Sequence, residues 1–314
     1  MNNNMKTNSP YAWFLAARPK TLAGAAVPVV MGCALGYHDT ANYGFPIVPA
    51  VLCLLFALIM QIDANFVNDY FDCRKGNDDE TRLGPKRACA EGWITMNAMQ
   101  RGIVITTLLA CAVGLPIVWY GGYTMILIGV ACVLFCFLYT TLFSYLGMGD
   151  LLVLLFFGIV PVCTIEYICL SQMSWYEGGG PTIYGLLYAL ACGFVIDTLL
   201  IVNNYRDIDN DRKAGKKTLI VRVGKEKGLL LYLVAGLAGI VLAFLTYLIL
   251  FGISTAAICT LALVPYAILH VSTYMEMKTI GEGRELNRTL GLTARNMSVF
   301  GLTSSLALIM PSIV

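Results

Sequence analysis

Charged side chains are scarce in this chain. Asp, Glu, Lys and Arg make up 13% of the 314 residues, whereas 58% of the residues are hydrophobic, and the mean hydropathy is +0.73. A soluble domain carries about 25% charged residues, so this chain has too few polar side chains to cover a fold in water. The composition excludes a soluble globular protein and predicts that most apolar side chains face lipid.

The chain also lacks the usual signals for export, cross-linking and nucleic-acid binding. Residues 1–20 are polar and contain no apolar stretch typical of a secretory signal, so we expect the chain to insert through its own helices. The 11 cysteines include no Cys-x-x-Cys pair, which argues against a disulfide framework and favours apolar packing. The net charge is +2 without a basic tail, and we expect no nucleic-acid partner.

Long apolar runs are what the chain has instead. A helix needs about 20 apolar residues to cross a bilayer, and nine stretches approach or exceed this length. They are 21–37, 45–69, 102–120, 123–142, 150–171, 182–204, 229–249, 253–274 and 292–313. We therefore predict an all-α membrane protein with nine transmembrane helices.

The distribution of Lys and Arg predicts the orientation. With nine helices, the loops after the first, third, fifth and seventh contain no Lys or Arg, and all 21 basic residues lie on the N-terminal side of the membrane. Basic residues mark the cytoplasmic side. We expect a multi-pass protein of the cell (inner) membrane, with its N-terminus inside and its C-terminus outside.

Acidic residues cluster at the ends of the second and sixth predicted helices. The stretch 68–72 reads Asn-Asp-Tyr-Phe-Asp and the stretch 203–207 reads Asn-Asn-Tyr-Arg-Asp, which match at three of five positions. Both lie at a predicted cytoplasmic helix end, and a duplication is the simplest explanation. We predict one transmembrane domain over 1–314, with pseudo-repeated motifs at 65–79 and 203–215.

Within each motif, two oxygen-bearing side chains are spaced by four residues. Asn68 precedes Asp72, and Asp207 precedes Asp211, so each pair lies on one helix face. If the two helix ends meet, their oxygen ligands converge in a way that suits Mg²⁺. The loops that follow are basic, which predicts a diphosphate held partly through the metal. The predicted diphosphate-binding residues are Arg82, Lys86, Arg87, Lys216 and Lys217.

These motifs resemble those of the UbiA superfamily of intramembrane prenyltransferases, in which helix 2 carries Asn-Asp-x-x-Asp and helix 6 carries Asp-x-x-x-Asp. Within that superfamily, several stretches resemble the enzymes that prenylate 1,4-dihydroxy-2-naphthoate in menaquinone biosynthesis. Those stretches are 17–22, 65–72, 76–78, 82–85, 147–150, 286–287 and 293–295. The resemblance implies a UbiA-like bundle of nine helices around a central cavity, with the isoprenoid tail in an apolar groove.

The resemblance also implies a reaction and roles for particular residues. Mg²⁺ would hold a polyprenyl diphosphate, the allylic C–O bond would ionise, and the naphthoate ring would attack with loss of CO₂, giving demethylmenaquinone. The implied metal ligands are Asn68, Asp69, Asp72, Asp78, Asp207 and Asp211. Asp72, Asp207 and Tyr139 are implied catalytic residues. The implied acceptor-binding residues are Arg18, Lys20 and Asp150.

Two other functions stay open at the level of the sequence. Another UbiA-type transferase would act on 4-hydroxybenzoate, haem or a glycerol phosphate, and a cation or phosphate transporter would use intramembrane acids. Transporters place their sites near the bilayer midplane, so acids at one membrane face favour the enzyme. Asp63, Glu166 and Asp197 lie within apolar helices, where a charge is costly and often functional. Each could serve the acceptor or act only in packing.

Overall fold

The computed structural model describes residues 5–41, 43–76, 82–173 and 180–312, and this part of the chain is helical, with no strand. It contains seven helical segments long and apolar enough to cross a membrane, which confirms the predicted all-α membrane class. These segments are Pro10–Asp39, Ile47–Lys75, Met96–Gly121, Thr124–Leu146, Gly149–Ser171, Ile183–Arg206 and Lys225–Leu261.

Several of the segments are assembled from shorter helices. Two π-helical turns, Tyr139–Phe143 and Leu155–Ile159, join α6 to α7 and α8 to α9. The α-helices, in chain order, are α1 (Pro10–Ala17), α2 (Leu22–Asp39), α3 (Ile47–Lys75), α4 (Met96–Gly114), α5 (Val118–Gly121), α6 (Thr124–Leu138), α7 (Ser144–Leu146), α8 (Gly149–Leu154), α9 (Val160–Ser171), α10 (Ile183–Arg206), α11 (Ile208–Lys213), α12 (Leu219–Val223), α13 (Lys225–Leu261), α14 (Val264–Ile280) and α15 (Leu286–Ile309).

The last third of the chain differs from the predicted spans. Gly252 has non-helical dihedral angles (φ 75°, ψ 173°), so α13 breaks there, between the predicted spans 229–249 and 253–274. The stretch predicted as 253–274 is itself interrupted before Val264, where Pro265 favours the start of a new helix. Because α14 has 17 residues and the less apolar α15 carries Arg288 and Arg295, neither is among the seven segments, and the count of nine is not confirmed.

The largest buried cluster joins α2, α10, α13 and α15. Tyr188, Tyr247 and Phe300 are fully buried in it. The two tyrosines keep their hydroxyl groups satisfied: Tyr188 bonds to the hydroxyl of Ser304, and Tyr247 donates to its carbonyl. Buried Tyr hydroxyls need such partners. This cluster holds α10, and therefore the second motif at its end, in a fixed position.

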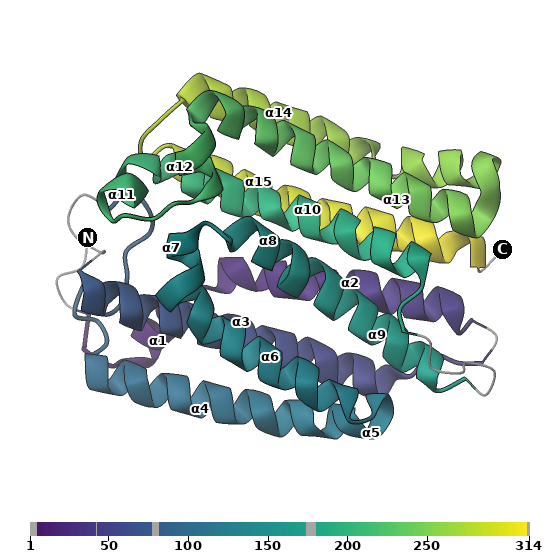
Figure 1. Cartoon of the computed structure of the whole chain (residues 1–314), viewed down its shortest axis with the longest axis horizontal. Helices are drawn as coiled ribbons and strands as arrows, with labels where there is room; N and C mark the ends of the chain where they lie inside the picture. Colours follow the sequence, from purple (N-terminus) through teal and green to yellow (C-terminus); the bar gives the residue numbers. More distant parts are fainter. Residues whose placement is uncertain (1–4, 42, 77–81, 174–179, 313–314) are drawn as a thin grey trace.

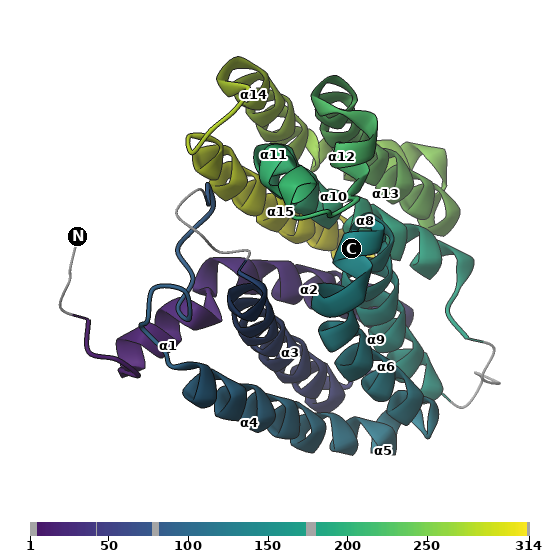
Figure 2. The same cartoon turned by 60° about the vertical axis from the view of Figure 1, so that its left-hand side comes forward.

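The long helices run along one direction and bring the chain repeatedly to the same two ends of the bundle (Figure 1). α1, α7, α11 and α12 lie at one end, whereas the end of α15 lies at the other (Figure 1). From a second direction, α4 lies beside α3, and α13 and α14 lie on the far side of α10 (Figure 2). Both acidic motifs belong to the end that carries α7 and α11.

Candidate active site

The first motif forms the final turns of α3, which continues to Lys75, past the predicted end at residue 69. Gly76 ends the helix in the left-handed region (φ 71°), where a glycine meets no steric penalty. Asn65, Asp69 and Asp72 are buried. The acids of this motif therefore face protein, not solvent, at the helix end.

Asp69 binds backbone. Its Oδ2 accepts the N–H of Ala88 at 2.9 Å, and its Oδ1 accepts the N–H of Cys89 at 2.8 Å. Asp69 is 1% exposed, and backbone donors of this kind would be costly to leave unpaired. Asp69 therefore attaches the turn at Ala88 and Cys89 to α3. This turn follows the first basic loop, 82–87, and its attachment fixes that loop next to the motif.

Of the predicted diphosphate-binding residues in this loop, Arg87 lies against a motif acid. Its guanidinium donates to Asp72 Oδ2 at 3.4 Å, and both side chains are about nine-tenths buried. Lys86 instead pairs with Glu91 and is 67% exposed. Arg82 donates from Nε to the carbonyl of Pro85 at 3.0 Å, which closes the loop on itself. Arg87 is thus the basic group of this loop that already neutralises part of the site.

Asn65 and Asn68 attach α3 to its neighbours. Asn68 Oδ1 accepts the hydroxyl of Thr140, in the π-helical turn that starts at Tyr139. Asn65 donates from Nδ2 to the carbonyl of Ala17 at 2.9 Å and to the hydroxyl of Thr21 at 3.0 Å. These contacts fix the stretch that contains two predicted acceptor-binding residues. They are Arg18, in the left-handed region, and the exposed Lys20.

The second motif is organised around Arg206, which is 3% exposed. Its Nε and Nη2 donate to the two carboxylate oxygens of Asp207 at 2.8 and 2.6 Å. The same guanidinium donates to the amide oxygen of Asn203 at 2.7 Å and to that of Asn287, on α15, at 2.8 Å. Such a fork is strong and directional. Arg206 therefore holds Asp207, a predicted metal ligand, in one orientation at the junction of α10 and α11.

Asp211 lies one turn further, in α11. Its backbone N–H bonds to the carbonyl of Asp207 at 2.8 Å, which preserves the predicted four-residue spacing on one face. Burial raises the pKa of Asp211 from 3.8 to about 6; the charges of Asp207 and Asp72 add to the rise, and Lys216 opposes it. The Lys216 ammonium is 3.8 Å from Asp211. The carboxyl of Asp211 is thus removed from water and borders both other acids, and Lys216 and Arg206 offset only part of the rise.

The two motif ends meet through the loop after α3. A Cβ atom on Gly84 would lie 2.9 Å from Arg206 Nη2, so this glycine lets the loop backbone approach the guanidinium. Asn287, the partner of Arg206, donates to the carbonyl of Leu83 at 2.9 Å. Asp72 is also close enough to raise the pKa of Asp211. The acids of α3 and of α10–α11 therefore border one polar region.

Tyr139, Asp150 and Lys217 lie on the third side of this region. Tyr139 is close enough to interact electrostatically with Asp150, Asp72 and Asp211. Asp150 is in the first turn of α8. The N–H of Lys217 donates to the carbonyl of Tyr145 at 3.1 Å, which docks the second basic loop on α7. The remaining predicted site residue, Asp78, lies outside the described residues.

The residues present fit Mg²⁺ by the chemistry of their donors. In the part of the chain that the structure describes, no three Asp, Glu, His or Cys side chains lie close enough to enclose a metal by themselves. Mg²⁺ in proteins is typically held by one or two carboxylates together with substrate phosphates. Asp211 and the two acids that interact electrostatically with it, Asp72 and Asp207, are oxygen donors that suit such a shared site.

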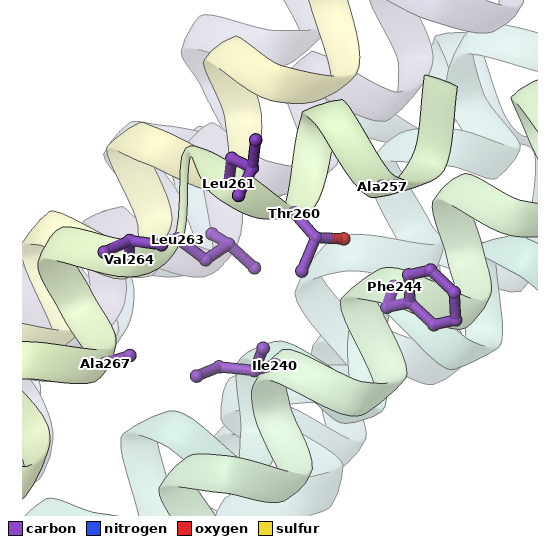
Figure 3. Close-up of a pocket in the computed structure, with 8 residues that line it drawn as sticks. All are labelled: Ile240, Phe244, Ala257, Thr260, Leu261, Leu263, Val264 and Ala267. Carbon is purple, nitrogen blue, oxygen red and sulfur yellow. The ribbon is translucent and has the colours of Figure 1, made fainter. Parts of the chain in front are cut away.

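Neither of the two cavities described in the structure lies between the two motifs, so the predicted central cavity is not confirmed. One, of about 350 Å³, lies between α13, the short helix after Gly252 and α14, with Ile240 and Phe244 facing Thr260 and Val264 (Figure 3). The other, of about 390 Å³, lies beside α3 and α4 and is lined by residues that include Tyr70 and Thr107.

Sequence reasoning missed the residues that position the site. Arg206 stands inside the second motif, yet only its contacts identify it as the group that orients Asp207. Asn287 and Thr140 are far from the motifs in sequence, and Gly84 lies just after the first motif; all three make contacts that join the elements of the site. The sequence signals for them were the adjacent Arg206 and Asp207 and the family-like stretches 82–85 and 286–287, none of which indicates a contact.

Comparison with known proteins identifies the family. The profile of the UbiA prenyltransferase family matches residues 25–287. The chain is 36% identical over 224 residues to a 1,4-dihydroxy-2-naphthoate octaprenyltransferase of Escherichia coli (strain K12), covering 68% of this chain and 69% of that protein. It is 31% identical over 305 residues to a protein of the same name from Mycobacterium tuberculosis (strain ATCC 25618 / H37Rv), covering 94% and 96%.

Solved structures share the fold. A UbiA homologue from Archaeoglobus fulgidus, bound to DMAPP and Mg²⁺, matches with a TM-score of 0.59 and 17% identity, covering 95% of this chain and 99% of that one. A UbiA homologue from Aeropyrum pernix K1 matches with a TM-score of 0.63 and 14% identity, again covering 95% and 99%. Together with the family profile and the relatives at 31–36% identity, these matches show that the chain belongs to the UbiA prenyltransferase family and is a multi-pass membrane prenyltransferase.

Proposed function

We propose that the chain transfers a polyprenyl group from polyprenyl diphosphate to 1,4-dihydroxy-2-naphthoate, with loss of the carboxyl group as CO₂, to give demethylmenaquinol, the hydroquinone that becomes demethylmenaquinone on later oxidation. The observation that carries this proposal is the meeting of two acidic motifs beside two basic loops, with Asp72 near Asp211 and Gly84 against Arg206. The names of the Escherichia coli and Mycobacterium tuberculosis relatives support the choice of acceptor.

The polar region would hold Mg²⁺ through oxygen donors of both motifs. These donors are Asn68, Asp72, Asp207 and Asp211, with Asp78 of the first motif as a further candidate. Bound there, Mg²⁺ supplies the positive charge that neutralises the diphosphate and stabilises it as a leaving group. Asp69, whose two oxygens already accept backbone donors, acts mainly by orienting the loop.

The basic groups position the diphosphate. Arg87 and Lys216 lie beside Asp72 and Asp211, so a diphosphate that enters between the motifs meets both cations at once. Arg206 holds the Asp207 carboxylate in one orientation while the negatively charged diphosphate binds. Tyr139 borders the same region, and the face of its ring stabilises the allylic cation as the C–O bond breaks.

We also propose that the whole chain, 1–314, is one domain that crosses the inner membrane nine times. α1 and the end of α15 lie at opposite ends of the bundle, as an odd number of crossings requires (Figure 1). The basic loops lie at the end that carries α11 and α12, and this supports the proposal that this end, the N-terminus and the active site are cytoplasmic. The polyprenyl tail then extends from the polar region toward the membrane interior.

The test is a substrate panel on purified protein in lipid nanodiscs, with products identified by mass. Polyprenyl diphosphate, Mg²⁺ and dihydroxynaphthoate should give CO₂ and demethylmenaquinol, which is detected as demethylmenaquinone after oxidation in air. Asp207→Asn should abolish transfer, whereas Asp209→Asn, in the same motif but 68% exposed, should not. Product from 4-hydroxybenzoate and none from the naphthoate would show that the acceptor is not the naphthoate. Equal activity of the two variants would show that the second motif takes no part in the reaction.

A further inference from the structure

Two acids face each other across the contact between α8 and α10, beside the polar region. The two helices run in opposite directions (Figure 1). A Cβ atom on Gly149 would lie 3.2 Å from Leu200, and one on Gly193 would lie 3.1 Å from the backbone of Leu154. In this antiparallel register Asp150 lies opposite Asp197. Asp150 is on the same face of α8 as Leu154, and Asp197 is on the same face of α10 as Gly193.

Both acids keep an unused hydrogen-bond acceptor. Asp197 is 5% exposed, and its buried Oδ1 has no hydrogen-bond partner among the described residues. The same holds for Oδ1 of Asp150 within the described chain. Buried polar atoms without partners are rare in native folds and call for an explanation. A ligand with hydrogen-bond donors would satisfy both oxygens.

Tyr139 connects this pair to the metal-binding motifs. A Cβ atom on Gly149 would lie 3.6 Å from the Tyr139 hydroxyl, and Tyr139 interacts electrostatically with Asp150 and Asp197 on one side and with Asp72 and Asp211 on the other. Tyr139 also opens a π-helical turn, a feature frequent at functional sites. A ligand held by the two acids would therefore lie next to the allylic carbon from which the diphosphate departs.

We propose that Asp150 and Asp197 form a subsite that binds the ring hydroxyl groups of the aromatic acceptor. The inference rests on the proposed function, because it needs a hydroxylated aromatic substrate. Two buried acids that face each other do not both ionise, so the pair carries one charge: its carboxylate accepts the hydrogen bond of a ring hydroxyl, and its protonated member exchanges a hydrogen bond with another. Charge-assisted O–H···O⁻ bonds are short and strong, and they raise the electron density of the ring that attacks the allylic carbon.

The proton balance follows from this placement. As the ring carbon bonds to the allylic carbon, the C–O bond to diphosphate breaks and its electron pair leaves on the diphosphate. The hydroxyl proton passes to the carboxylate that holds it, and the ring oxygen becomes a carbonyl. When the carboxyl group departs as CO₂, its bonding electrons return to the ring, and the carboxylate gives the proton back to the oxygen.

The variants Asp150→Asn and Asp197→Asn test the subsite. Each should raise the KM for the acceptor about tenfold, the difference between a charged and a neutral acceptor of a hydrogen bond. The KM for polyprenyl diphosphate should stay unchanged, which distinguishes an acceptor subsite from general damage. Asp63→Asn is the matched control, because Asp63 is a fully buried acid of a membrane segment whose two carboxylate oxygens already accept the hydroxyls of Thr106 and Thr107.

Acceptor analogues that lack one hydroxyl group complete the test. If a carboxylate binds a hydroxyl, its variant and the analogue without that hydroxyl each cost affinity, but together they cost no more than either alone. Fully additive losses for both acids, an equal rise in KM for both substrates, or the same effect in Asp63→Asn would overturn the proposal. If the wild type uses a different phenol, the naphthoate assignment fails, while the same cycle on that phenol still tests the subsite.

Discussion

Protonation of Asp211 should control how Mg²⁺ activation depends on pH. Burial raises the pKa of Asp211 from 3.8 to about 6, with the charges of Asp207 and Asp72 adding to the rise. A proton and a divalent cation compete for this carboxylate. We expect the half-saturating Mg²⁺ concentration to be constant well above pH 6 and to rise up to about tenfold for each pH unit below it.

The magnitude also predicts an effect on folding stability. One pKa unit corresponds to about 1.36 kcal/mol, so the rise from 3.8 to about 6 stabilises the neutral carboxyl in the fold by about 3 kcal/mol. In the absence of metal, this contribution is complete below pH 3.8 and is lost as the pH rises through 6. Mg²⁺ at neutral pH should restore it, because the cation supplies the positive charge that the proton supplied in acid.

The assay compares wild type with Asp211→Asn and with the exposed neighbour variant Asp209→Asn in nanodiscs, on both sides of pH 6. Prenyl transfer gives the Mg²⁺ dependence, and the Mg²⁺-induced shift in Tm reports binding even for an inactive variant. Diphosphate also takes up protons in acid, so the Tm shift is measured without substrate. Only Asp211→Asn should lose the pH dependence.

Two outcomes would refute the reasoning. The first is a wild-type Mg²⁺ affinity that does not change as the pH falls below 6, since competition at a carboxyl of that pKa must appear there. The second is an Asp209→Asn variant that loses the pH dependence as completely as Asp211→Asn does.

The remaining predictions concern residues that position the motifs. Asp69→Ala should lower the free energy of unfolding by about 2–5 kcal/mol in thermal or chemical denaturation, because the N–H groups of Ala88 and Cys89 lose their acceptor; a loss below 1 kcal/mol would contradict this role. Gly84→Ala should push the Arg206 guanidinium off Asp207 and reduce kcat/KM about tenfold. Its control, Gly129→Ala, meets no atom within 4 Å and should leave activity unchanged; equal activity of the two variants would contradict the steric argument.

The positions of the helices and of both motifs could be predicted from the sequence because they depend on local patterns. Apolar length sets which stretches enter the membrane, and most of the predicted spans coincide with helices of the structure. Asp207 and Asp211 lie on one helix face across the junction of α10 and α11, because a backbone hydrogen bond continues the helical turn between them. Such relations reach only one turn along the chain.

The orientation of individual side chains could not be predicted, because it depends on partners distant in sequence. Asp69 was predicted to be a metal ligand or a neighbour that orients the site, and its sequence position could not show that its oxygens accept the N–H groups of Ala88 and Cys89. Lys86 and Arg87 are adjacent and both basic, but Arg87 meets Asp72 while Lys86 meets Glu91. Spacing alone does not distinguish the two.

The sequence by itself determined that the chain is a helical membrane protein with oxygen-rich motifs at two helix ends. Hydropathy and helix periodicity are properties of contiguous residues, so they need no knowledge of the fold. The tertiary structure alone decided that Arg206 binds the Asp207 carboxylate, that Gly84 lets the loop backbone approach Arg206, and that Asp150 faces Asp197. These pairings follow from the register in which helices pack, which is set by the side chains of many distant residues together.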